Sequence, residues 1–396
     1  MGLHNEHRLF LDLLKNPLSK IYILQATLTF VKSLIGIFVP VYFYSLGFSL
    51  TLIGIYLAVI SLTSLLLMPL STQLIKTLGY KYTILLSLPL YLIHIFLINY
   101  VQNSTIVVFI AAILFGTYVA FFWPAYHLEL SQQGSTKNRA KEIGTLQVII
   151  TLVSSISPFI GGVFLDYLSY TELLMFSFVI LFFGFIPFLF SSDPPLKVYS
   201  IKYRDYKKLI LGITLNQRIA FFSEGSEFVI AAYFWPIIIF VLLGSSFLKL
   251  GLVFTVVALI SVVFITYFKS YVDSHSKKKV LLIATKCMSV NWIVRGFMLL
   301  IFLPLIYISE AFQKLIVSTY HLSYSSLFYN NANHSKDQFL YVMTHEIIIH
   351  ISRIFLSLLI AVCTLYISSI HNLFLVIILL GIFIPFGLAK YQENLF

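Results

Sequence analysis

Long apolar stretches recur through this chain and constrain its fold more than any other feature of the sequence. From residue 20 almost to the end, mostly apolar runs alternate with short polar segments. A run of roughly 20 apolar residues, folded as a helix, spans a bilayer core of about 30 Å. The sequence therefore predicts an all-α integral membrane protein with little chain left for a soluble domain.

Composition and charge support the membrane assignment. Hydrophobic residues make up 59% of the 396 positions and charged residues only 10%. The formal net charge is +11, but the basic residues flank the apolar runs and do not form one patch. Charge placed in this way indicates membrane topology and not a nucleic-acid partner. The two cysteines, Cys287 and Cys363, both lie inside apolar runs and predict neither a disulfide framework nor a metal site.

Twelve apolar runs can be separated, and one linker divides them into two sets of six. The runs lie near residues 20–46, 49–75, 80–101, 104–128, 142–165, 171–191, 212–243, 247–271, 279–306, 309–330, 340–368 and 372–390. The seventh run is long enough to be broken around "FFSEGSEF". The predicted parts are an N-terminal segment (1–19), a six-helix bundle (20–191), a linker (192–211), a second bundle (212–390) and a tail (391–396).

Lysine and arginine positions give the orientation. If the N-terminus is inside, most basic residues fall in inside segments, whereas the outside connections hold only Lys249. Positive charge is retained on the cytoplasmic side of membranes, so both termini are predicted to be cytoplasmic. Abundant Ile, Lys, Tyr and Phe indicate an AT-rich prokaryotic genome, and hence a protein of the plasma membrane.

The two halves show weak internal similarity. The segment "LGYKYTILLS" after the second run matches "HSKKKVLLIA" after the eighth, and "TLQVII" in the fifth run matches "THEIII" in the eleventh. Transporters are commonly built from repeated halves, with the substrate site near the midplane between them.

With twelve spans in two halves, inside termini and a basic linker, the chain resembles the major facilitator superfamily. The family's gating motif, G-x-x-x-D-R/K-x-G-x-R/K-R/K, is partly kept after the second span by Gly79 and Lys81, while Lys76 stands at the acidic position. In the second half the matching residues are Asp273, Lys277 and Lys278. The resemblance implies two pseudo-symmetric six-helix bundles that rock around a central site, with the first, fourth, seventh and tenth helices lining the cavity.

The fifth span, "GTLQVIITLVSSISPFIGG", resembles the family's antiporter-type motif. The residues that it keeps are Gly144, Pro158, Gly161 and Gly162. The resemblance favours export. A proline and small residues are also what helix kinking and close helix packing need, so a purely structural role stays open.

Charged residues inside the spans are the strongest functional candidates, because each costs roughly 2.5 to 3.5 kcal/mol at the bilayer centre. Lys32 falls in the middle of the first span and shares a helical face with Gln25. This face is expected to look into the central cavity. Lys32 is therefore a candidate anion site or half of a gating ion pair, and the alternative is a structural ion pair.

Two carboxylates in the seventh span are candidates for proton coupling. Glu224 and Glu227 are three residues apart, so they share a helical face. Two close carboxylates repel each other, and we expect one of them to hold a proton near neutral pH. The alternative is that "SEGSE" is an unwound, hydrated stretch whose glutamates pair with Lys32 or Arg218.

The fourth, ninth and tenth spans add further polar residues. His321 is a candidate for substrate binding or proton relay, with a packing role as the alternative. Glu310 and Lys314 are expected to form an i,i+4 pair, and Arg295 to pair with a neighbour or to reach the interface. Aromatic residues of the fourth span could face the cavity and sandwich an organic substrate, but for Trp123 an interfacial aromatic belt is favoured. His127 nearby has no assigned role.

The segment "THEIIIHISR" invites comparison with a zinc peptidase helix, but its spacing excludes one. Two histidines that share a zinc ion on a helix are four residues apart, whereas His345 and His350 are five apart, about 140° around the axis. No enzyme activity, metal or cofactor is therefore predicted. Glu346, His350 and Arg353 instead form a polar seam, either for charge relay or anion contact or as an ion pair that holds the two halves together.

The predicted function is secondary active transport of a small organic solute, coupled to protons and with a lean toward export. Lys32, Arg353 and Arg295 favour an anionic solute, while amphipathic or drug-like molecules stay open. The protein is expected to act as a monomer in the lipid bilayer. The alternative is a membrane protein that does not transport, such as a receptor, an assembly factor or a degenerate member of the family. The eroded gating motif and the low count of 18 glycines support this alternative.

Overall fold

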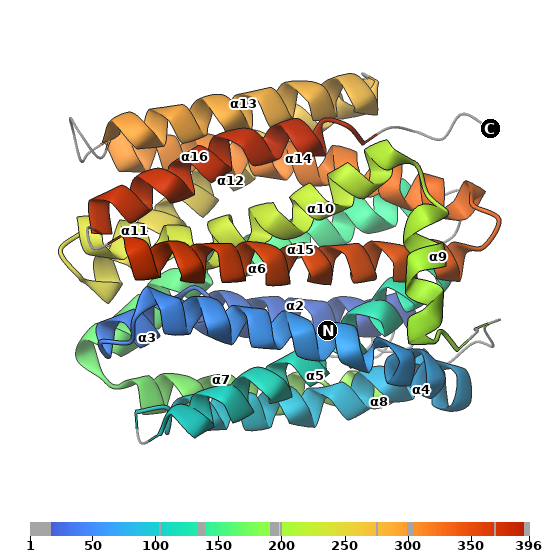
Figure 1. Cartoon of the computed structure of the whole chain (residues 1–396), viewed down its shortest axis with the longest axis horizontal. Coiled ribbons are helices and arrows are strands. Elements are labelled where there is room, and N and C mark those ends of the chain that lie inside the picture. The colour runs from blue at the N-terminus through green and yellow to red at the C-terminus, as the bar shows by residue number, and fades with distance from the viewer. Residues whose placement is uncertain are drawn as a thin grey trace, which may run out of the picture.

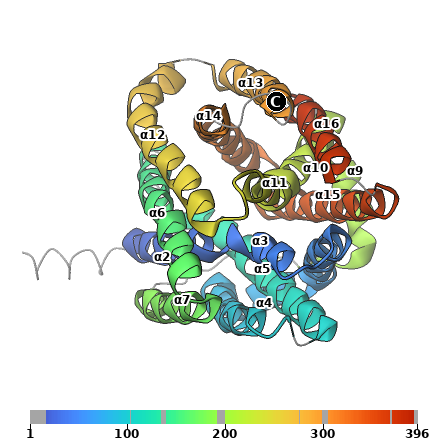
Figure 2. The ribbon, with the colours of Figure 1, turned by 90° about the vertical axis from the view of Figure 1, so that its left-hand side faces the viewer.

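The computed structural model of the chain consists of two sets of helices. It describes residues 17–102, 104–133, 139–190, 198, 200–274, 276–298, 305–367 and 370–391. Within these ranges there is no strand. Figure 1 shows the helices of the two halves running side by side along the long axis of the molecule. Figure 2 views the bundle from one end and shows the halves meeting where α6 lies beside α12 and α4 beside α15.

The first half contains the first six spans. Its helices are α2 (Pro17–Ile35), α3 (Phe38–Ser45), α4 (Leu50–Ile98), α5 (Thr105–Gln133), α6 (Arg139–Tyr167), α7 (Tyr170–Gly184) and α8 (Ile186–Leu189). Together α2 and α3 form the first span, which breaks at Gly36. Helix α4 contains the second and third spans, joined at Gly79 with φ +86°. Glycine is suited to this turn because the left-handed region costs it no steric clash.

The second half contains the other six spans and the described part of the linker. Its elements are η1 (Tyr203–Asp205), α9 (Tyr206–Leu211), α10 (Leu215–Val229), η2 (Ile230–Phe234), α11 (Trp235–Leu242), α12 (Phe247–Ser274), α13 (Lys277–Met298), α14 (Leu305–His334), α15 (Gln338–Tyr366) and α16 (Ile370–Leu388). The seventh span consists of α10, η2 and α11. The break expected at "FFSEGSEF" is wrong, because this stretch is α-helical and the irregular part is the π-helix η2 directly after it.

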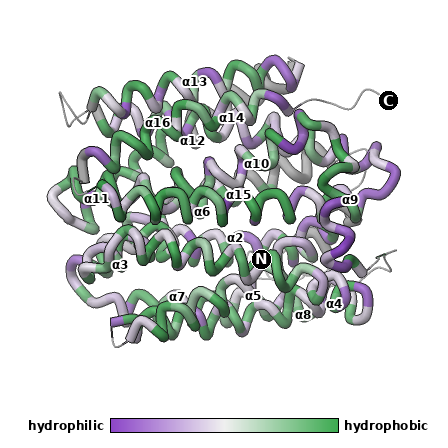
Figure 3. Tube along the Cα trace, viewed as in Figure 1, coloured by the Kyte–Doolittle hydropathy of each residue, from purple (hydrophilic) through white to green (hydrophobic). Residues whose placement is uncertain are grey.

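The surface that these helices present is largely apolar. Eight helical stretches of the described chain are long and apolar enough to cross a membrane, and one of them, α4, is 49 residues long and holds two spans. Figure 3 shows apolar residues along the lengths of the helices and hydrophilic residues gathered mainly toward their ends. This distribution fits a protein whose middle section lies in the hydrocarbon core of a bilayer and whose two ends lie in water.

Small residues bring the backbones of the two halves into direct contact. A Cβ atom at Gly162 of α6 would lie 2.8 Å from the carbonyl oxygen of Phe247 in α12, and Gly251 of α12 faces the Pro158 carbonyl in the same way. Beside them, the Phe159 N–H donates a hydrogen bond to Thr255 Oγ1 of α12 (3.0 Å). Small residues allow such close approach between membrane helices, where association depends on packing and hydrogen bonds.

The second seam between the halves joins α4 to α15. A Cβ atom at Gly54 would lie 2.9 Å from the carbonyl oxygen of Ser357 and 3.0 Å from Cβ of Ala361. Near this contact the hydroxyls of Thr51 and Thr364 share a hydrogen bond of 2.5 Å. The halves are therefore joined along two helix pairs, and the space enclosed between these pairs holds the candidate site.

The tight α6/α12 contact generates a stability prediction. A Gly162→Val substitution should force α6 away from the α12 backbone and lower the free energy of unfolding by about 1–3 kcal/mol, as overpacked cores do. Thermal unfolding of the purified protein in detergent measures the loss. Gly296→Ala is the matched control, because a Cβ atom there would meet its nearest neighbour at an ordinary 3.4 Å. Equal melting temperatures for the two variants would contradict the packing assignment.

Candidate functional site

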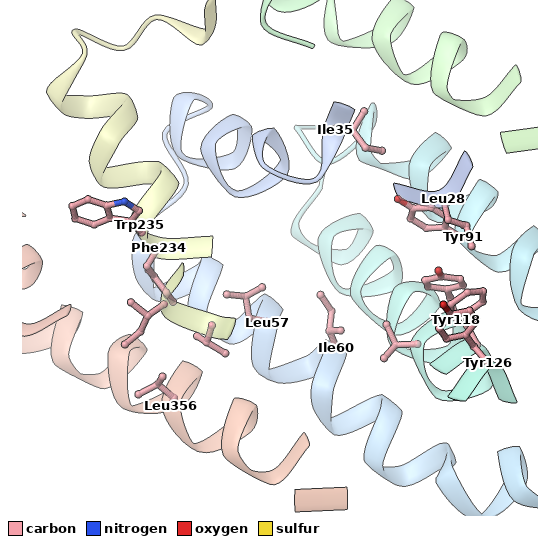
Figure 4. Packing of buried hydrophobic residues seen from close by; sticks show 14 of the residues in the cluster. Leu28, Ile35, Leu57, Ile60, Tyr91, Tyr118, Tyr126, Phe234, Trp235 and Leu356 are labelled. Atoms are coloured by element: carbon pink, nitrogen blue, oxygen red, sulfur yellow. The ribbon is translucent and has the colours of Figure 1, made fainter. Parts of the chain in front are cut away.

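A cavity of about 650 Å³ lies between the two halves and is lined by both of them. Figure 4 shows apolar side chains packed close to it, with Leu57 and Ile60 of α4 between Phe234 and the tyrosines Tyr118 and Tyr126 in this view. The predicted site residues that line the cavity are Lys32, Glu224, His321, Glu346, His350 and Arg353. Two other candidates, Gln25 and Glu227, are not among its lining residues.

Lys32 is held by aromatic rings and not by a carboxylate. Its Nζ atom lies 4.5 Å from the ring centroid of Trp123, 5.2 Å from that of Phe122 and 5.3 Å from that of Tyr118, all three on α5. A ring face attracts a cation through its quadrupole, and the attraction increases when the cation is desolvated. Among the described residues, Lys32 takes part in no ion pair, so the alternative in which Glu224 or Glu227 pairs with Lys32 does not hold.

The wall around Lys32 is a stack of aromatic side chains from α4 and α5. Tyr91 lies 4.7 Å from Tyr118, Tyr118 lies 5.3 Å from Phe122, and Phe122 lies 5.5 Å from Tyr126, each pair being stacked. Trp123 lines the cavity with them. The favoured place of Trp123 in an interfacial belt is therefore wrong, because its ring lines the cavity and lies 4.5 Å from the Lys32 ammonium group.

The opposite wall holds a chain of carboxylates and histidines. Glu224 of α10 lies 2.8 Å from His345 Nε2 on α15, and the other ring nitrogen of His345 lies 3.5 Å from Glu346. His350 follows one turn later, with its Nε2 atom 3.9 Å from Glu346. The tight α10/α15 packing behind this chain comes from Gly225, whose position leaves no room for a side chain beside Ser352 and Ile349.

His127 connects this series of carboxylates and histidines to the first half of the protein. Its Nε2 atom lies 3.6 Å from Glu346, and its Nδ1 atom lies 3.1 Å from the hydroxyl of Tyr329 on α14. The ring also stacks on Trp123, with the ring centroids 5.6 Å apart. His127 of α5 thus connects the aromatic wall around Lys32 to the acidic wall of the second half.

Arg353 and His321 complete the cavity lining. The guanidinium carbon of Arg353 lies 4.3 Å from the ring centroid of Phe228, and its buried Nε atom has no hydrogen-bond partner in the described chain. No ion pair of the described residues includes Arg353. His321 packs against the ring of Tyr320 at 4.9 Å. The predicted seam therefore holds Glu346 and His350 in one cluster and leaves Arg353 on an aromatic face.

A second buried charge cluster lies away from the cavity. Arg295 of α13 is 1% exposed and donates to Glu310 of α14 over 2.6 Å, between the rings of Trp235 and Trp292. The indole N–H of Trp235 donates to the same carboxylate oxygen over 2.7 Å. Arg295 therefore pairs with a neighbour, as expected. Glu310 does not form the expected ion pair with Lys314; its Oε1 atom accepts from Arg295 and Trp235 instead.

None of the predicted gating and kink residues whose side chains the structure describes lines the cavity. Lys81 is buried with its Nζ atom 5.3 Å from the ring of Tyr82, whereas Lys278 is exposed and Lys277 is half-buried. The side chain of Asp273 lies outside the described part of the structure, and Gly144 lies in the first turns of α6. Gly161 packs against Leu34 of α2 and Phe38 of α3, so both of the adjacent glycines of the motif serve helix contacts.

Sequence reasoning missed two residues that the structure brings into the cavity. They are His127 and His345. His345 was considered only as a zinc ligand, and among the described residues no group of histidine, cysteine and carboxylate side chains is arranged to hold a metal ion. A usable signal was present, because histidines inside apolar spans carry the same desolvation cost as other polar groups.

Comparisons with known proteins agree with this architecture. The family model described as Major Facilitator Superfamily matches residues 21–331. No curated protein sequence matches the chain. Similar solved structures include a D-xylose–proton symporter (TM-score 0.69, 12% identity), which covers 97% of this chain and 98% of its own.

Two further solved structures have the same fold. The human organic anion transporter MFSD10 (TETRAN) matches with a TM-score of 0.68 and 13% identity, over 95% of this chain and 99% of its own. The nucleoside transporter NupG matches with a TM-score of 0.67 and 10% identity, over 95% of this chain and 100% of its own. The predicted arrangement of two six-helix bundles is confirmed by these likenesses.

The Arg295–Glu310 pair generates a second prediction. Arg295→Met should destabilise the protein by about 3–5 kcal/mol, because it leaves the Glu310 carboxylate buried without its partner. The double variant Arg295→Met/Glu310→Leu should recover much of this loss, since neither charge then remains. Denaturant unfolding of the two variants measures the difference. As a control, Arg204→Met removes an exposed pair with Asp205 and should cost at most about 1 kcal/mol. A double variant that is less stable than Arg295→Met would contradict the assignment.

Proposed function

Because the chain belongs to the Major Facilitator Superfamily of membrane transporters, we propose that it carries a small organic anion across the membrane by alternating access, coupled to protons. The halves rock around the cavity between them, and the protein acts as a monomer. The fold hosts both chemistries in other proteins, since its solved examples include a proton symporter and an organic anion transporter.

The observation that carries the proposal is the charge pattern of the cavity. Two cations and two carboxylates line it, with five histidines. Both carboxylates, Glu224 and Glu346, already contact histidines, whereas Lys32 and Arg353 rest on aromatic faces without an ion pair among the described residues. An anionic solute supplies the charge that these two cations lack. Aromatic rings beside Lys32 offer apolar area for the organic part of the solute.

Proton coupling is proposed for the Glu224–His345–Glu346 chain. Glu224 faces the cavity and holds His345 at 2.8 Å, so loss or gain of one proton changes the attraction between α10 and α15. His127 contacts Glu346 from the other half, and protonation of this group therefore alters the contact that the two halves must break to rock apart. Glu227, which does not line the cavity, has the smaller role.

The direction of transport is proposed to be export. The similarity of the fifth span to the antiporter-type motif, at Pro158, Gly161 and Gly162, supports this direction. In this exchange, Lys32 and Arg353 bind the outgoing anion in one step, and the Glu224–His345–Glu346 chain takes up the incoming proton in the next. The prokaryotic plasma membrane, with both termini cytoplasmic, is the proposed location.

Removal of the Lys32 charge tests the anion site. Lys32→Met should weaken anion binding by about 10- to 100-fold, because a hydrogen bond to a charged group is worth about 1.5–3 kcal/mol. Thermal stabilisation of the purified protein by acetate, benzoate, succinate and citrate measures the effect. Lys249→Met is the matched control, since Lys249 is exposed and remote from the cavity. If no organic anion stabilises the parent protein and only neutral or cationic solutes do, the anion assignment fails.

A second variant separates coupling from transport. Glu224→Gln should retain exchange of labelled anion across proteoliposome membranes and lose accumulation driven by a pH gradient, because the glutamine cannot bind the proton. Glu172→Gln is the control, since Glu172 is exposed at the start of α7. A Glu224→Gln protein that still accumulates anion under a pH gradient would remove Glu224 from the coupling chain. No flux of any solute in the parent protein would favour a non-transporting role.

A further inference from the structure

The linker between the halves is fastened to the C-terminal half of the second span, between Leu65 and Thr72. Residues 200–211, which we name the strap, contain η1 and α9. The Tyr206 hydroxyl donates to the carbonyl oxygen of Leu65 over 2.8 Å, and the Tyr203 hydroxyl donates to that of Leu66 over 2.6 Å. A third bond joins the Ile201 N–H to Thr72 Oγ1 over 3.1 Å.

Proline chemistry explains why the strap is fastened here. Leu65 lies four residues before Pro69, which has no backbone N–H, so the Leu65 carbonyl has lost its normal helical donor. A carbonyl without a partner is costly inside a membrane span. The Tyr206 hydroxyl supplies the missing donor. Tyr203 packs edge-on against Tyr206, with ring centroids 5.8 Å apart, and satisfies the next carbonyl.

The strap also reaches the other half of the protein. Helix α9 packs against α15, and α15 packs against α4 along the seam at Gly54. Figure 1 shows α9 running across the end of the bundle, roughly perpendicular to the long helices. The strap therefore bridges the α4/α15 seam, which the halves must loosen when they rock apart.

The outer face of the strap is basic. Lys202, Arg204, Lys207 and Lys208 are all exposed, and Asp205 is the one acidic residue of the strap. Asp205 accepts from the Lys202 N–H (2.9 Å), so its charge caps η1. Apolar side chains flank the cations, with Tyr203 59% and Leu211 56% exposed. Figure 3 shows hydrophilic residues gathered along the part of the strap next to α4.

We propose that the strap is a binding site for the headgroups of anionic phospholipids in the adjacent leaflet. Clustered cations beside a membrane span attract negative lipids, and exposed Tyr and Leu side chains enter the boundary between headgroups and acyl chains. A bound anionic lipid holds the strap against the Leu65 and Leu66 carbonyls and so stabilises the closed α4/α15 seam. This site lies apart from the cavity, and the inference does not depend on the transported solute.

Lipid titration of the purified full-length protein tests the proposal. In neutral detergent, short-chain phosphatidylglycerol should raise the melting temperature by several degrees in a saturable way. Phosphatidylcholine with the same chains and free glycerol phosphate should leave it unchanged. An equal shift in melting temperature with glycerol phosphate would mean that the site binds soluble phosphate compounds. An equal shift with phosphatidylcholine would mean that binding does not depend on the charge of the headgroup. Either result overturns the proposal.

Charge-removal variants locate the effect. Replacing Lys202, Arg204, Lys207 and Lys208 by Gln should raise the half-saturating phosphatidylglycerol concentration at least about tenfold. The matched control neutralises four exposed lysines elsewhere, Lys249, Lys279, Lys336 and Lys390, and should retain the parent response. An unchanged response in the strap variant, or the same loss in the control, overturns the assignment.

Two smaller variants keep the test usable if the fourfold variant does not fold. Lys207→Gln/Lys208→Gln alters exposed side chains that make no ion pair in the described chain, and it should weaken the response severalfold. Tyr206→Phe keeps all the cations and removes the donor to Leu65. It should lower the melting temperature without lipid and leave the half-saturating phosphatidylglycerol concentration within about twofold of the parent value. A large change in that concentration would mean that the tether, and not the basic face, controls the response.

Discussion

The bilayer core offers no water to hydrogen-bond a peptide group, and the irregular parts of this protein follow from that constraint. Pro69 removes the helical donor to the Leu65 carbonyl in the second span, and the Tyr206 hydroxyl of the linker replaces it. The first span breaks at Gly36, where the Gly36 N–H still reaches the Lys32 carbonyl over 2.7 Å. The seventh span leaves α-helical geometry at residues 230–234, where it borders the cavity and packs against neighbouring helices. Irregular backbone thus occurs where other protein groups cover it.

Charged groups inside the membrane also need protein groups that stabilise them, and this protein supplies such groups in three ways. Arg295 and Glu310 neutralise each other between two tryptophans, away from the cavity. The cavity glutamates are held by histidines, which can change charge with pH. Lys32 is held by three ring faces, which attract the ammonium group without cancelling its charge. The aromatic contacts leave the positive charge of Lys32 able to bind a mobile anion, whereas the ion pair neutralises the charge of Arg295.

The fold could be predicted from the sequence because span length and charge placement depend on the bilayer, and the bilayer acts on each span separately. Candidate residues such as Lys32, Glu224 and Glu346 could also be predicted, because a charged side chain within a span is energetically costly and therefore indicates a function or a partner. Their partners could not. Lys32 meets rings about 90 residues later in the chain, and Glu346 meets His127 from the opposite half. Those pairings depend on the rotation of each helix about its own axis. A membrane helix is apolar on nearly all of its faces, so its sequence does not show which face points to which neighbour. The irregular part of the seventh span was also misplaced, because the π-helix covers Ile230–Phe234, after the polar "SEGSE" and not within it.

The contact between α6 and α12 has a consequence for how such a protein can change over evolutionary time. Gly162 and Gly251 place backbone against backbone, with Pro158 between them, so no side chain is present to adjust its rotamer when a neighbour grows. A larger residue on one helix must be met by a change on the other, in a part of the chain almost 90 residues away. The two halves are therefore co-adapted along this seam. A half transplanted from a distant relative should fold well yet fit poorly, and its fit should improve first through substitutions at these three positions.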